Sequence, residues 1–122
     1  MARIYVTQAT GNGLSSETSI KYRAFTSADP RQAWDFDAEA WGVYGTVSEA
    51  SSLSAEVPIN VYDEFVINLP DEIHAVDAVI QVCTAAGQAV FAFNKDANSL
   101  HAYNPGLVPM ASGSRVKVLN SI

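Results

Sequence analysis

The chain has 122 residues, of which 48% are hydrophobic and 16% are charged, and its formal net charge is −6. This length fits one domain, which can bury roughly two-thirds of its unfolded surface without a metal or a disulfide. The seven Lys and Arg residues are scattered. Nucleic acids and anionic membranes are bound through basic patches, so we expect neither as a partner.

The charged fraction is below the roughly 25% that is typical of soluble proteins. It indicates either that much of the surface contacts another protein or that a compact sandwich carries loops rich in Ser, Thr and Asn. The first residues, MARIYVTQATG, lack an apolar run long enough for a signal peptide, and no stretch approaches a membrane span. Cys83 is the only cysteine and lies in an alternating segment, so we expect it to be buried in a chain that folds in a reducing cytoplasm.

Alternation of apolar and polar residues predicts strands in the first part of the chain. Residues 2–8 alternate, and so do residues 19–25, with a Gly- and Ser-rich loop between them. Residues 29–42 are ambiguous, because Asp29, Pro30 and Gly42 could cap a helix whereas Trp34 and Phe36 belong to an alternating run. We favour a strand or an irregular segment there, since helical periodicity is poor around Phe36.

Further strands are predicted in the middle of the chain. Residues 43–47 form a short strand, and a Ser-rich loop covers residues 48–56. The run from Val57 to Leu69 keeps one apolar phase that Asp63 interrupts. A buried unpaired carboxylate is costly, so we expect a bend there that splits the run in two, and Pro70 ends it.

The last third is predicted to contain two consecutive hairpins and a terminal strand. Residues 75–84 form the first strand, and Gly87 supplies the positive φ of the turn. A second turn at residues 94–99 and a strand at residues 100–103 follow, and residues 115–122 close the chain. The residues that we expect to face the core are Val76, Ala78, Ile80, Val82, Phe91, Phe93, Val116 and Val118.

About eight short strands separated by turn residues indicate an all-β protein. We predict a single β-sandwich domain over residues 1–122, jelly-roll-like in topology, with a barrel as the alternative.

Catalytic and metal-binding patterns are weak. Asp35, Asp37 and Glu39 have the spacing of some Ca²⁺ loops, but the glycine and distal glutamate of an EF-hand are absent, so a solvated acidic face is favoured. His74 and His101 are the only histidines, too few and too far apart for a zinc site. No nucleophile elbow or phosphate loop occurs. We therefore predict no enzyme activity, no catalytic residues, no metal and no cofactor; a small hydrolase would need a convergent carboxylate pair.

Three aromatic residues are candidates for an interaction surface: Trp34, Trp41 and Tyr103. Exposed and coplanar rings would form a platform for sugars or a receptor, whereas buried rings would be ordinary packing.

One segment resembles a known family. Phe93, Asn94, Leu100, Ala102 and Tyr103, followed by a Gly-rich loop and the run 116–119, are similar to the C-terminal half of small structural proteins of tailed bacteriophages. The resemblance implies a jelly-roll head decoration (cement) protein, which is made in the host cytoplasm and sits as a trimer on the virion, bound to the major capsid protein.

The resemblance leaves two roles open. As a decoration protein, the chain would use the loops at residues 8–19 and 48–56 as contact segments. The alternative is a carbohydrate- or receptor-binding β-sandwich of a phage tail or fibre, which would use the three aromatic residues named above.

Overall fold

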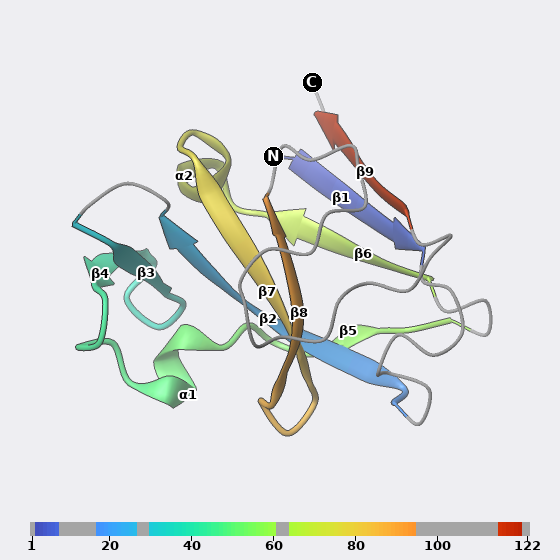
Figure 1. The fold of residues 1–122 in the computed structure, drawn as a ribbon, viewed down its shortest axis with the longest axis horizontal. Helices are drawn as coiled ribbons and strands as arrows, with labels where there is room; N and C mark the ends of the chain where they lie inside the picture. The colour runs from blue at the N-terminus through green and yellow to red at the C-terminus, as the bar shows by residue number, and fades with distance from the viewer. Residues whose placement is uncertain (1, 8–16, 27–29, 61–63, 95–114, 121–122) are drawn as a thin grey trace.

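The computed structural model describes residues 2–7, 17–26, 30–60, 64–94 and 115–120, which form two antiparallel sheets around one core (Figure 1). The smaller sheet has the order β6-β1-β9, with β1 at Ala2–Thr7, β6 at Glu64–Leu69 and β9 at Arg115–Asn120. Its strands come from the two ends and the middle of the chain. The all-β, sandwich-like fold predicted from the sequence is confirmed.

The larger sheet has the order β4-β3-β2-β7-β8. Its strands are β4 at Ala40–Val43, β3 at Gln32–Asp35, β2 at Ser19–Thr26, β7 at Ala78–Thr84 and β8 at Ala89–Asn94. A two-residue strand, β5 at Val57–Pro58, pairs with the start of β2. β6 and β4 are therefore end strands in the orders of their sheets.

The core collects one alternating phase from each sheet, as expected for two packed sheets. Ile4, Val6 and Ile67 come from the smaller sheet, whereas Ile20 and Ile80 come from the larger one. Phe91 and Phe93 are fully buried, as predicted, and Gly87 adopts a φ of +92° in the turn before them.

The ambiguous region is a β-hairpin, so the strand interpretation is correct. β3 and β4 pair with Trp34 opposite Trp41, and residues 36–39 form the turn. The strand predicted at residues 43–47 is wrong, because β4 ends at Val43. A turn follows, in which the Thr46 amide bonds to the Val43 carbonyl at 3.0 Å and Gly45 takes a φ of +90°.

The interrupted run at residues 57–69 divides as expected. β5 pairs with the larger sheet and β6 with the smaller one, so the chain crosses between the sheets there. Residues 61–63, including Asp63, lie outside the described residues. Because the run is split, its first part pairs with the larger sheet and its second part with the smaller one.

Two short helices were not predicted. α1 at Glu49–Ser52 lies in the Ser-rich loop and is capped by Ser48, whose side chain accepts a hydrogen bond from the Ser51 amide. α2 at Asp71–His74 follows Pro70 and buries Ile73. Each spans four residues, too few for a periodic signal, and the described part of the chain has no helix that could cross a membrane.

The inward phase predicted for residues 76–82 is correct except at its start. Ala78, Ile80 and Val82 are buried, but Val76 is 38% exposed, because it precedes β7 in the connection from α2. Asn94, predicted to begin the second turn, is the last residue of β8. The rest of the predicted second hairpin, residues 95–103, and the side chains of Val116 and Val118 lie outside the described part.

Candidate functional site

The three acidic residues lie at the β3–β4 turn: Asp35 ends β3, and Asp37 and Glu39 are in the turn itself. The Asp35 carboxylate accepts hydrogen bonds from the amides of Asp37 and Ala38, each at 2.9 Å, which is turn geometry rather than ligand geometry. The Asp37 carboxylate accepts a hydrogen bond from the Ser51 hydroxyl at 2.7 Å and so ties the turn to α1. Within the described residues, no group of three His, Cys, Asp or Glu side chains could hold a metal.

Trp34 and Trp41 face each other across the hairpin, but they do not form a platform. Trp34 is only 3% exposed, and Trp41 is half-buried against the core. Their ring centroids are 5.3 Å apart with an interplanar angle of 80°, an edge-to-face contact. The coplanar exposed pair that a carbohydrate-binding module would use is therefore absent here, and Tyr103 lies outside the described residues.

Cys83 is buried beside Arg23, on the face of β7 opposite the core residues Ile80 and Val82. The Arg23 Nη1 atom donates to Cys83 Sγ at 3.2 Å, to Gln81 Oε1 at 3.2 Å and to the Gly87 carbonyl at 3.3 Å. Its Nε atom donates to Ser52 Oγ at 3.1 Å. Burial raises the pKa of the Cys83 thiol, and the nearby Arg23 charge opposes this only in part. The burial predicted for Cys83 is confirmed, and a thiol with a raised pKa is a weak nucleophile.

The histidines do not converge on a site in the described structure. His74 ends α2, and its Nδ1 atom is buried without a hydrogen-bond partner in that part of the chain. His101 lies outside it.

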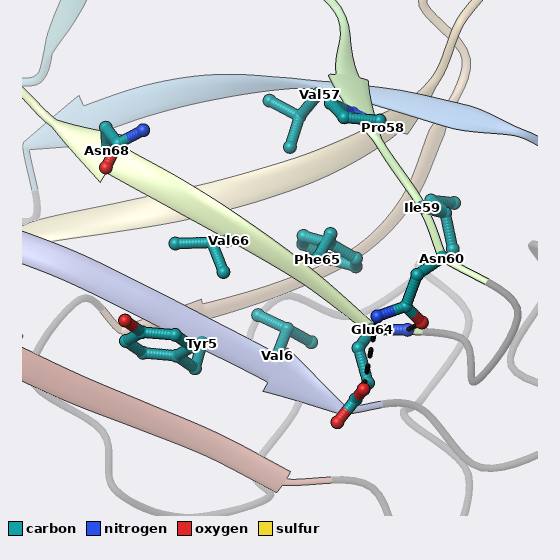
Figure 2. A pocket seen from close by; sticks show the side chains of 10 residues that line it. All are labelled: Tyr5, Val6, Val57, Pro58, Ile59, Asn60, Glu64, Phe65, Val66 and Asn68. Atoms are coloured by element: carbon teal, nitrogen blue, oxygen red, sulfur yellow. Dashed lines mark hydrogen bonds between the residues drawn. The ribbon is translucent and has the colours of Figure 1, made fainter.

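A groove of about 640 Å³ opens between β6 and the segment 57–60 (Figure 2). Its described lining residues are Tyr5, Val6, Val57, Pro58, Ile59, Asn60, Glu64, Phe65, Val66 and Asn68. In Figure 2 the segment carrying Pro58 and Ile59 approaches β6 at Asn60 and diverges from it toward Asn68. A second hollow of about 360 Å³ shares Val57, Pro58, Val66 and Asn68, so the two adjoin. The groove was not predicted from the sequence, in which the interrupted run at residues 57–69 is the one feature that signals it.

A second candidate surface lies where β4 ends. Val43 is 61% exposed and Tyr44 is 50% exposed, and Figure 1 places this strand at the margin of the larger sheet. The Tyr44 ring meets Phe25 edge to face with centroids 5.5 Å apart, and the Arg31 guanidinium lies 5.4 Å from its centre. The ring is thus held in place while one side remains open to solvent.

Comparisons with protein-family models, curated proteins and solved structures found no match to this chain. No family is assigned on that basis. The likeness of residues 93–119 to phage structural proteins therefore stays a prediction.

Proposed function

We propose that this protein is a structural virion protein, a decoration protein that binds the outer capsid shell of a tailed phage and stabilises it. Two sequence features support the proposal: the resemblance within residues 93–119 and the charged fraction of 16%. The β-sandwich is the architecture that the resemblance implies. The partner would be the major capsid protein, and the protein would act as a trimer.

The observation that carries the proposal is the exposed pair Val43 and Tyr44, where β4, an end strand of the larger sheet, gives way to a turn. Exposed apolar residues on a sheet edge invite association, and soluble proteins usually cover or charge such edges. Tyr44 is already fixed between Phe25 and Arg31, so little side-chain entropy remains to be lost when it docks. Tyrosine is also among the residues enriched at binding hot spots.

The proposed mechanism is physical rather than chemical. Each copy would bury its apolar edge against a shell subunit, and the segment 48–56, which includes α1, lies next in the chain and would widen the contact. A shell repeats the same site many times, so several modest contacts made by one oligomer would combine into tight binding. Capsomers linked in this way would resist internal pressure.

The test is co-sedimentation of the purified protein with shells of the phage that encodes it. We expect saturable binding that Tyr44→Ala weakens about tenfold or more, as for a hot-spot residue. Glu72→Gln is the matched control, since Glu72 is exposed on α2, outside the segments proposed to make the contact, and should leave binding unchanged. Absence of wild-type binding would refute the decoration role, and equal binding by Tyr44→Ala would refute the proposed contact.

A further inference from the structure

The side of β6 that faces away from β1 can be located from the hydrogen bonds of Glu64 and Asn68. The Glu64 carbonyl accepts from the Asn60 amide at 3.0 Å, and the Glu64 amide donates to the Asn60 side chain at 3.1 Å, so both main-chain groups of Glu64 face away from β1. Two residues beyond Val66, the Asn68 carbonyl accepts a long hydrogen bond from the Tyr22 hydroxyl at 3.5 Å, again away from β1. In an antiparallel pair the N–H and C=O groups of successive residues alternate in direction. Val66 lies two residues from both Glu64 and Asn68, so its N–H and C=O groups also face away from β1.

Val66 and Asn68 therefore present main-chain groups to the groove. Within the described residues, no hydrogen bond is found for the Val66 amide, the Val66 carbonyl or the Asn68 amide. Unpaired groups of this kind along an edge strand are a template for another strand.

The opposite wall of the groove cannot supply this pairing. Val57 is paired with Ile20 of β2, and the Ile59 amide donates to the Thr18 carbonyl at 2.9 Å, so both face the larger sheet. Pro58, between them, faces the groove and has no N–H to donate. An added strand would therefore pair with β6 and only pack against Pro58.

The two ends of the groove set its length. Asn60 bonds directly to Glu64 and closes one end, as the dashed lines in Figure 2 show. The other end reaches Tyr22, Phe36 and Pro70. Two alternate pairing residues, Val66 and Asn68, match a partner of about three to five extended residues at the usual rise of a strand.

The lining defines the chemistry of the partner. It is mostly apolar, and Glu56 and Glu64 are its only charged members among the described residues. Glu64 stands at the end that Asn60 closes, and Glu56 lines the adjoining hollow at the other end. They favour a partner with basic residues at its ends and apolar residues at alternate positions between them.

From this geometry we infer that the groove binds an extended peptide segment of another protein, apolar in its centre and flanked by Lys or Arg, which adds a strand to β6. Main-chain hydrogen bonds to Val66 and Asn68 supply affinity, and the apolar walls and the two carboxylates supply selectivity. This site is separate from the β4 edge and does not depend on the virion role proposed above.

The experiment titrates the full chain with the acetylated and amidated peptide Lys-Val-Thr-Val-Thr-Lys, followed by amide NMR. We expect shifts centred on the Val66 and Asn68 amides and slower hydrogen exchange at both. A peptide methylated on alternate backbone nitrogens, and one with Glu in place of both Lys residues, should each bind about tenfold more weakly, the scale of a lost hydrogen bond or charge contact.

Variants of Val66 make the test specific. Val66→Pro removes the edge N–H and should weaken binding about tenfold, whereas Val66→Ala keeps the N–H and should bind within about twofold of wild type. If Val66→Pro fails to fold, the methylated peptide still decides the matter. Three outcomes would overturn the inference: no shift at Val66 and Asn68, equal binding of the methylated peptide, or a wild-type dimer that Val66→Pro dissociates, which would mean that a second copy occupies the edge.

Discussion

Asn60 and Glu64 are joined three times: amide to carbonyl at 3.0 Å, amide to side-chain oxygen at 3.1 Å and side chain to side chain at 3.2 Å. This contact links the end of the segment that follows β5 to the start of β6. It therefore joins the two sheets where the chain crosses between them, and it closes one end of the groove.

Asn60→Ala should lower the free energy of unfolding by about 1–2 kcal/mol, because it removes two side-chain hydrogen bonds at once. The matched control is Asn68→Ala, an exposed asparagine on β6, which should change stability by less than about 0.5 kcal/mol. Urea denaturation followed by circular dichroism measures both. Equal effects of the two variants would show that the Asn60 contact contributes nothing to stability.

The two glycines with positive φ provide a matched pair. Gly45→Ala has open space around the new Cβ, so it isolates the backbone cost of about 1–2 kcal/mol. Gly87→Ala has a similar φ but also places its Cβ 3.0 Å from Leu53 Cδ1. We expect Gly87→Ala to destabilise more than Gly45→Ala in thermal unfolding, and the reverse order would contradict the turn geometry described here.

The Trp34–Trp41 contact should be measurable as a coupling energy. A double-mutant cycle with Trp34→Leu and Trp41→Leu should give about 0.5–1.5 kcal/mol beyond the additive effect. Trp34 emission should be blue-shifted in the folded protein, since its ring is buried. Additive variants, or an emission maximum typical of an exposed indole for Trp34, would contradict the edge-to-face packing.

Tyr22 should make stability depend on alkaline pH. It is 4% exposed, and burial raises the pKa of its phenol well above the ordinary value. The unfolded state ionises this tyrosine near pH 10 and the folded state does not, so the stabilisation is complete below about pH 10 and is lost as the pH rises above it.

Tyr22→Phe should therefore reduce the loss of stability between about pH 10 and pH 11.5. At pH 7 its cost should stay below about 1 kcal/mol, since the hydroxyl makes only a 3.5 Å hydrogen bond to the Asn68 carbonyl. Denaturation curves at several pH values, with tyrosinate absorbance recorded in parallel, provide the measurement. Identical pH profiles for the two proteins would show that Tyr22 does not stay neutral in the folded state.

Much of the fold could be predicted because its strands alternate clearly. Residues such as Ile4, Ile20 and Ile80 occupy the core as their period-two pattern indicates. α1 and α2 were missed because four residues are too few for helical periodicity. Val43 was predicted to begin a strand over residues 43–47, whereas it ends β4, because the turn that contains Gly45 with its positive φ stops the pairing of β4 with β3.

The sites could be predicted less well, because they depend on contacts between distant segments. Trp34 and Trp41 are seven residues apart, and only the hairpin register decides that they meet edge to face. The groove needs β5 and β6 to join different sheets. Composition and local pattern carry no information on such pairings.

The virion role proposed above is tested most directly by quantitative mass spectrometry of purified particles of a phage whose genome is found to encode this chain. We predict that the protein is present in a fixed ratio to the major capsid protein and remains bound through repeated sedimentation. Particles that contain no copy of it, or lose it completely on the first wash, would contradict the decoration role.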